Sequence, residues 1–221
     1  MTANLATMDP ISARRQEEKE RRRNDILDAA ERVASASGLE SLTMDQVARE
    51  ARLSRGLLYV YFQDKHDLES GICERALIGL QARLESLVAE NPSGLDRVVA
   101  LGRAYVTFAA ECPLQFEALA RFEATDASTM GTGSNDCACL AAGARVHALI
   151  TAALEVGMRD GSVARSAGPP NTIALALWAM THGTIQVASM KRAVLTQHGV
   201  TPAALVEQTL RMAANALRPG E

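Results

Sequence analysis

Residues 43–68 read TMDQVAREARLSRGLLYVYFQDKHDL, and this stretch decides the fold. Thr43 and Gln46 have the spacing of a capping box, in which each side chain bonds the backbone amide of the other, so a helix is predicted to begin there. The apolar pattern then breaks, and Ser54 can cap a second short helix. The stretch 43–62 therefore predicts a helix-turn-helix.

The two short helices have an apolar inner side and a mixed outer side. Five apolar residues can pack together and hold the helices nearly perpendicular: Val47, Ala48, Leu53, Leu58 and Phe62. The second helix is expected to present another set to solvent: Arg55, Gly56, Leu57, Tyr59, Val60 and Tyr61. A helix of this size fits the major groove of B-DNA, which predicts that this one reads DNA.

The composition of the whole chain favours helices. Of 221 residues, 48% are hydrophobic, which excludes disorder, and only 4% are aromatic, which argues against a β-sandwich. The formal net charge of −3 excludes a broadly basic protein but allows a local basic face. We expect an all-α fold of about nine helices, with an N-terminal three-helix domain that contains the helix-turn-helix and a C-terminal helical domain.

The expected helices follow apolar spacings of three and four and end at Gly, Pro or small polar residues. One precedes the helix-turn-helix, from about Ala13 to Gly38. Six follow it, over about 64–90, 95–112, 113–123, 137–159, 171–197 and 202–217. Thr125–Asp136 is expected to be a loop.

The sequence also predicts a cellular location. The N-terminus lacks a basic region before an apolar core, so it does not resemble a secretory signal. We find no stretch of about 18 residues free of polar interruption, so no membrane span is expected. The four cysteines are unevenly spaced, which argues against a disulfide framework. A cytoplasmic protein with reduced thiols and no membrane partner is expected.

The opening stretch resembles the TetR/AcrR family of one-component transcriptional regulators. Its signature is similar to T-x-x-x-[IV]-A-x-x-A-G-[VL]-S-x-G-[TL]-[LI]-Y-x-[HY]-F-x-x-K-x-x-L, and nearly every position matches from Thr43 to Leu68. The resemblance implies a flexible arm over 1–13, a DNA-binding domain over 14–68 and a helical ligand-binding and dimerisation domain over 69–221. It implies a regulator of transcription rather than an enzyme.

Two positions depart from the family pattern. Arg52 stands where the family has a turn glycine, and a left-handed backbone there costs an arginine about 1 kcal/mol more than a glycine. Leu57 replaces a common threonine, which removes a hydroxyl and offers an apolar contact to a thymine methyl. Both departures bear on the DNA sequence that is read. In the C-terminal part, Leu177–Gln186 (LWAMTHGTIQ) is similar to a Trp-x-x-x-His-Gly pattern of some members.

The resemblance implies particular DNA contacts that fit the chemistry of the side chains. Thr43 lies at a helix N-terminus, which attracts phosphate, and Lys65 offers a charged phosphate contact. Arg55 is the best candidate to read a base, because its guanidinium can donate two hydrogen bonds to a guanine edge. The complete expected set is Thr43, Ser54, Arg55, Gly56, Leu57, Tyr59, Val60, Tyr61 and Lys65.

A basic stretch precedes this domain. Ala13–Arg23 carries six basic and three acidic residues, a net charge of +3. The stretch either contacts phosphates or a minor groove, or forms a solvated helix with pairs such as Glu17–Arg21.

The C-terminal two-thirds contain no recognisable catalytic arrangement, so no catalytic residue, cofactor or bound metal is expected. Cys137 and Cys139, with His147, are the nearest approach to a metal cluster, but their C-x-C spacing differs from ordinary zinc sites. Small residues packing at a helix start is the favoured interpretation, with a soft-metal or thiol-reactive sensor as the alternative. A small-molecule pocket is expected to involve Phe108, Phe116, Arg121, Phe122, His147, Trp178, His182 and Gln186.

Dimerisation is expected because two symmetry-related recognition helices can read a palindrome. The resemblance implies that the last two long helices pair with their mates, and the predicted interface comprises Ile173, Leu177, Ile185, Leu205, Leu210 and Leu217. The expected partners are double-stranded DNA, an unknown small-molecule effector and a second copy of the chain. We expect a repressor in which ligand binding tilts the helix after the helix-turn-helix. An activator, a ligand-independent regulator and a dimeric adaptor with vestigial DNA binding are the alternatives.

Overall fold

The protein is all-helical throughout the part that the structure, a computed structural model, describes: residues 9–125 and 134–220. These ranges contain no strand, which confirms the predicted fold class. Their ten α-helices are α1 (Pro10–Ser37), α2 (Met44–Glu50), α3 (Arg55–Tyr61), α4 (Lys65–Glu90), α5 (Gly94–Glu111), α6 (Pro113–Ala124), α7 (Ser134–Asp160), α8 (Pro170–Met190), α9 (Arg192–Gln197) and α10 (Pro202–Leu217).

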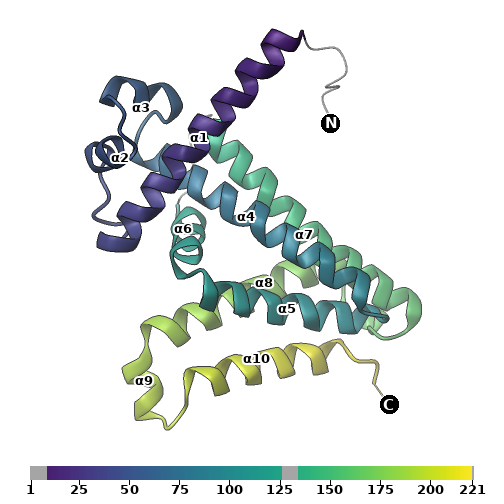
Figure 1. The fold of residues 1–221 in the computed structure, drawn as a ribbon. Helices are drawn as coiled ribbons and strands as arrows, with labels where there is room; N and C mark the ends of the chain where they lie inside the picture. The colour runs from purple at the N-terminus through teal and green to yellow at the C-terminus, as the bar shows by residue number, and fades with distance from the viewer. Residues whose placement is uncertain (1–8, 126–133, 221) are drawn as a thin grey trace.

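Helices α1, α2 and α3 gather at one end of the molecule around the start of α4 (Figure 1). Their apolar side chains form one core, whose largest fully buried members are Ile26, Leu27, Leu39, Leu42, Val47, Leu58, Phe62, Leu68 and Ile72. Because Leu68 and Ile72 belong to α4, that helix is part of this core as well as of the C-terminal domain.

A second core fills the C-terminal domain. Helices α4 and α7 run side by side away from the helix-turn-helix, and α5, α8 and α10 pack beneath them (Figure 1). Leu84 and Leu154 are among its fully buried residues, and Tyr105, Phe108, Phe116 and Phe122 supply its aromatic side chains. Long α4 therefore connects the two cores.

The helix starts in this part of the chain follow the predicted caps. The Thr43 hydroxyl accepts from the Gln46 amide, and Gln46 accepts from the Thr43 amide in return, which confirms the capping box. Ser54 caps α3 and Asp64 caps α4 by accepting from the Leu57 and Asp67 amides. Local sequence thus fixes where the functional helices begin.

Three predicted boundaries are wrong. Helix α1 begins at Pro10, whose ring suits the first turn of a helix, so residues 10–13 are not a flexible arm. Residues 1–8 lie outside the described part, as do 126–133 of the expected loop. Helix α7 begins at Ser134, before the predicted Cys137. The predicted helix over 171–197 is two helices separated at Lys191, which raises the number from nine to ten.

The expectation of no membrane-length apolar helix also needs correction. The segments Asn135–Asp160 and Pro170–Met190 are long and apolar enough to span a membrane, with mean hydropathy of 1.6 and 1.2. Polar residues interrupt both segments, but they are too few to bring the mean hydropathy below that of a membrane-spanning helix. Core helices of soluble proteins meet the same criterion, and α7 and α8 pack against other helices here.

A buried polar network joins the N-terminal helices to α7. The Arg23 guanidinium donates to Glu74 on α4, at 2.6 Å, and to Asn135 on α7, at 2.8 Å. The Asn135 amide donates to the Asp67 carboxylate, also at 2.8 Å. One turn further along α4, Ser70 donates to Asp136. The start of α7 is thereby fixed to the part of α4 that follows the helix-turn-helix.

Candidate functional site

The outer side of α3 is the first candidate site. Leu58 and Phe62 are fully buried beneath the helix, whereas Leu57, Tyr59 and Val60 are 39%, 42% and 72% exposed. Ser54, Arg55 and Gly56 are exposed too, and Tyr61 is half-buried. The predicted inner and outer sides of the helix are confirmed, and α3 presents a short, mixed surface of the kind that enters a DNA groove.

The conformation of Arg55 is fixed by two neighbours. Its guanidinium lies 2.7 Å from the Asp45 carboxylate on α2, and a hydrogen bond with Tyr59, together with Asp45, raises the pKa of Arg55. Asp45 therefore orients the arginine at the cost of partly neutralising it. Sequence reasoning missed this pair, although Asp45 lies within the quoted stretch.

The turn before α3 has the left-handed backbone that the sequence predicted. Arg52 has a φ of 56°, the only positive φ of a non-glycine residue in the described ranges. The amide of Leu53 donates to the carbonyl of Ala48, which closes the turn. Arg52 therefore occupies a backbone conformation that favours glycine, which adds strain to the turn.

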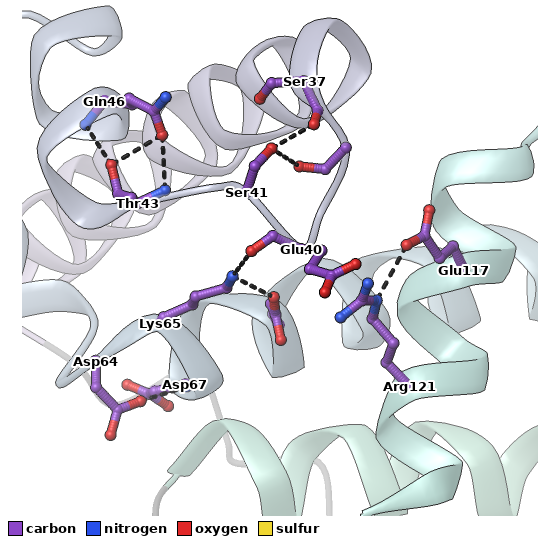
Figure 2. Close-up of polar contacts among 12 residues, drawn as sticks. Ser37, Glu40, Ser41, Thr43, Gln46, Asp64, Lys65, Asp67, Glu117 and Arg121 are labelled. Carbon is purple, nitrogen blue, oxygen red and sulfur yellow. Dashed lines mark hydrogen bonds and ion pairs between the residues drawn. The ribbon is translucent and has the colours of Figure 1, made fainter.

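Figure 2 shows the other predicted phosphate contacts, Thr43 and Lys65. Thr43 is exposed, and its hydroxyl remains within the capping box. The Lys65 ammonium donates to the backbone carbonyl of Glu40 at 2.6 Å and lies 3.7 Å from the Glu69 carboxylate. In this conformation Lys65 links α4 to the loop after α1. A DNA phosphate that bound the Lys65 ammonium would share it with the Glu40 carbonyl and the Glu69 carboxylate.

The basic stretch lies along one continuous, mostly exposed helix. Its last member, Arg23, points inward to the polar network and lies over the Phe62 ring, 5.6 Å from the centroid. Arg23 therefore has a structural role, and any DNA contact of the stretch falls to the residues before it.

A cavity of about 310 Å³ lies in the C-terminal domain. Side chains from α4, α5, α6, α7 and α8 line it: Leu77, Leu80, Tyr105, Leu119, Phe122, Glu123, Cys139, Leu140, Gly143, Ala144, Val146, His147 and Trp178. Leu140 and Ala144 are exposed, so the cavity opens to solvent along α7. Its size and apolar walls suit a small organic molecule.

The polar groups of the cavity meet at Glu123. Its Oε2 lies 3.2 Å from Nε2 of His182, and Nδ1 of His182 lies 2.7 Å from the Tyr105 hydroxyl. Burial raises the pKa of Glu123 to about 8, while burial lowers the pKa of His182 and of His147. The cluster is therefore uncharged or nearly so at neutral pH when the cavity is empty.

The structure brings together some of the predicted pocket residues. Phe122, His147 and Trp178 line the cavity. Gln186 and Phe116 lie behind it, the first 3.1 Å from His182 and the second stacked on it. His182 itself supports the wall through Tyr105.

Two other predicted pocket residues do not line this cavity, and two residues that belong to it were not predicted. Phe108 is buried beside Tyr105 without lining the cavity. Arg121 faces Glu117 at the junction between the domains, because it points to the other side of α6 (Figure 2). Glu123 and Tyr105 were not predicted, although the acid directly beside Phe122 was a signal for the first.

The cysteines do not form the suggested cluster. Cys137 is exposed and Cys139 is buried, because residues two apart point to different sides of a helix. The Cys139 thiol instead lies 2.7 Å from the Cys73 thiol on α4, and this contact together with burial raises the pKa of Cys73. No group of three His, Cys, Asp or Glu side chains suited to a metal occurs among the described residues.

Two family models match this chain. The model described as bacterial regulatory proteins of the tetR family matches residues 26–69. The model described as a tetracyclin repressor-like C-terminal domain matches residues 98–213, more than half of the chain. The chain belongs to the TetR family of transcriptional regulators.

Curated relatives of this TetR-family protein match over shorter stretches. HTH-type transcriptional regulator HbdR of Aromatoleum sp. (strain CIB) is 47% identical over 22% of this chain and 21% of the relative. AcrR of Shigella flexneri is 36% identical over 29% of this chain and 30% of the relative. The uncharacterized regulator YfiR of Bacillus subtilis (strain 168) is 33% identical over 47% and 52%. The chain thus spans about a fifth to a half of their lengths.

Solved structures share the fold over most of the TetR-family chain. A Rhodococcus sp. RHA1 protein of unknown function is 24% identical with a TM-score of 0.70, over 90% of this chain and 95% of that one. E. coli NemR in its reduced form is 20% identical with a TM-score of 0.61, over 90% and 100%. FadR of Bacillus subtilis with stearoyl-CoA is 14% identical with a TM-score of 0.64, over 88% and 98%.

Half of the predicted dimer stripe of this TetR-family chain packs within its own protomer. Ile173, Ile185 and Leu217 are buried within the protomer, and Leu177, Leu205 and Leu210 are half-buried. The apolar spacing marked the sides of α8 and α10 that pack within one chain. The large apolar residues exposed on α8, α9 and α10 are instead Leu175, Met180, Val187, Met190, Val194 and Met212.

Proposed function

We propose that this TetR-family regulator is a cytoplasmic repressor that binds a palindromic operator as a homodimer and is released by a small apolar ligand. The exposed outer side of α3, above a fully buried inner side, carries the proposal. Arg55, held by Asp45 and Tyr59, is positioned to read a base, while Leu57 and Val60 offer apolar contacts.

Ligand release would operate through α4. The same helix supplies Lys65 and Asp67 beside the helix-turn-helix and Leu77 and Leu80 to the cavity wall. A ligand that fits one tilt of α4 better than another would change the separation of the two recognition helices. A hundredfold difference in ligand affinity between the two states would supply about 2.7 kcal/mol. The stearoyl-CoA in the FadR structure supports ligand binding within this fold.

The exposed apolar residues of α8, α9 and α10 support dimerisation. Single exposed apolar residues are normal on a protein surface, but here six large apolar side chains are exposed on three consecutive helices. Such a grouping is typical of an interaction surface. If this surface pairs with the same surface of a second copy, the dimer presents two α3 helices. These two helices could then enter successive major grooves of the DNA.

The test is fluorescence anisotropy with DNA from upstream of the gene itself, titrated at two salt concentrations. Tight binding should weaken by about tenfold or more in Arg55→Ala, since a bidentate base contact contributes about 1–3 kcal/mol. Tyr59→Phe should weaken binding less, because it removes one hydroxyl.

Arg83→Ala is the matched control, since Arg83 is an exposed arginine of α4 paired with Glu111, remote from α3. It should leave DNA affinity unchanged. Equal weakening by Arg83→Ala and Arg55→Ala would contradict the proposed interface. If the upstream DNA binds only weakly and without sequence preference, selection from a random DNA library replaces it, and failure to enrich any site contradicts sequence-specific binding.

A further inference from the structure

The described residues that line the 310 Å³ cavity include one carboxyl side chain, that of Glu123, and no lysine or arginine. The remaining wall is aliphatic and aromatic apart from His147, Cys139 and the Tyr105 hydroxyl. A ligand with a negative charge would therefore meet no counter-charge in this wall, whereas a positive charge would meet Glu123.

Two polar atoms at this wall are buried without a hydrogen bond: Oε2 of Glu123 and Nδ1 of His147. The Glu123 oxygen has Nε2 of His182 at 3.2 Å, a contact without hydrogen-bond geometry. The His147 ring meets Trp178 edge-on, with 5.4 Å between the ring centroids. Buried polar atoms without partners cost free energy, so a ligand that satisfies them gains affinity.

The aromatic rings of the wall add a second attraction for positive charge. Trp178, Tyr105 and Phe122 line the same cavity as Glu123. The negative faces of such rings attract cations, most strongly for tryptophan. A carboxylate and aromatic rings together form the kind of surroundings that stabilise an organic cation and do not favour an organic anion.

We propose that the cavity binds a lipophilic organic cation, with its positively charged nitrogen against Glu123 and its apolar body against Trp178, Phe122 and the leucines. This inference rests on the proposed ligand release, since it names the class of that ligand. It excludes fatty acids and other carboxylates as the main effectors of this chain.

A pH dependence follows from the groups around Glu123. His182 from α8 lies 3.2 Å from it, Tyr105 from α5 and Cys73 from α4 interact with it electrostatically, and His147 from α7 lines the same cavity. Burial lowers the pKa of both histidines, so neither is positively charged near pH 7. Burial raises the pKa of Glu123 to about 8, so a cation that binds at pH 7 displaces the proton of Glu123. Affinity for a permanent cation should rise with pH up to about 8 and then level off.

Three probes with a similar phenylalkyl body test the proposal: phenylbutyltrimethylammonium, phenylbutanol and phenylbutyrate. Binding is measured without DNA, by calorimetry and by the emission of Trp178, the single tryptophan of the chain and part of the wall. At pH 8.5 the cation should bind about tenfold or more tightly than the alcohol, and the anion most weakly. The preference should shrink as the pH is lowered to 6.5.

Glu123→Gln should abolish the preference for the cation while phenylbutanol still binds, which shows that the variant cavity is folded. Glu155→Gln, which removes an exposed acid of α7, should leave the preference intact. Equal binding of the cation and the alcohol, tighter binding of phenylbutyrate, or an unchanged preference in Glu123→Gln would overturn the proposal, as would failure of all three probes to bind. If the cation binds as expected but does not release operator DNA, the ligand class stands and the proposed release mechanism fails.

Discussion

At the scale of single residues, Arg52 shows how a family position can change without loss of the turn. Its φ of 56° is a conformation that costs most residues about 1 kcal/mol relative to glycine. The closing bond from Leu53 to Ala48 is made by the backbone, so it does not depend on which residue occupies position 52.

Relief of this strain in Arg52→Gly should raise the free energy of unfolding by about 0.5–1 kcal/mol. The net gain is smaller, because glycine also increases the conformational entropy of the unfolded chain. Urea unfolding followed by circular dichroism measures the change. Arg52→Ala is the control, because it removes the charge but keeps the strain, and it should not stabilise the protein. Stabilisation by Arg52→Ala as large as that by Arg52→Gly would assign the effect to charge instead.

The buried carboxyl of Glu123 predicts a stability that depends on pH. Its pKa rises from an ordinary value of 4.5 to about 8 in the folded protein, so the folded state binds the proton more tightly. The stability that this carboxyl contributes is fully present below pH 4.5 and is lost as the pH rises through the interval up to about 8.

Between pH 7.5 and 8 the histidines with lowered pKa are almost entirely neutral in both the folded and the unfolded state, so they contribute little to the slope. In this window the free energy of unfolding should fall by up to about 1 kcal/mol per pH unit in the parent protein. Thermal melts should show that Glu123→Gln has a flatter profile. Parallel profiles for the two proteins would mean that Glu123 is already ionised in the folded state.

At the scale of helices, close backbone approach fixes how α5 meets α7. A Cβ atom on Gly94, at the start of α5, would lie 2.0 Å from the backbone nitrogen of Gly157 on α7. In the sequence, Gly94 looks like an ordinary residue of the break between two helices. Its close contact with Gly157 cannot be predicted, because the two positions are 63 residues apart. Its neighbourhood is also fixed by polar bonds, since the Gly94 amide donates to the Asp160 carboxylate.

Gly94→Ala should destabilise the protein by about 2 kcal/mol or more, since backbone cannot yield as a flexible side chain can. Gly79→Ala on α4 is the matched change, because a Cβ there meets nothing within 4 Å. It should stabilise by about 0.5–1 kcal/mol through helix propensity alone. Chemical denaturation of both variants checks the opposite signs, and equal effects would contradict the close approach.

For the whole molecule, the proposed dimer depends on the exposed apolar side of α8. Val187 is 42% exposed there, whereas its neighbour Ile185 is buried within the protomer. The two residues are similar in hydrophobicity. Residue type alone therefore does not show which one is buried within its own chain and which one is exposed.

Val187→Glu should shift the protein towards monomer in sedimentation velocity and weaken operator binding by at least about tenfold, because one recognition helix reads only a half-site. Ile78→Glu places the same charge on an exposed apolar position of α4, 48% exposed, and should leave the assembly unchanged. A Val187→Glu protein that sediments as the parent does would exclude this surface as the interface.

The helical class, the helix-turn-helix, its caps and its outer side could all be predicted from the sequence. These features depend on contacts between residues three or four apart, which the pattern contains directly. Lys65 shows the limit of that reasoning, since its bond to the Glu40 carbonyl joins segments that only the fold brings together.

The ligand cavity and the outward side of α8 could not be predicted from the sequence, because both depend on how distant helices pack. Glu123, Tyr105 and His182 come from three helices, and Arg121 lies on another side of α6 from the cavity wall, although it directly precedes Phe122. Ile185 and Val187 show the same limit on α8. Apolar spacing reports that a helix is buried, but packing in three dimensions decides which side is buried in its own chain and which remains available to a partner.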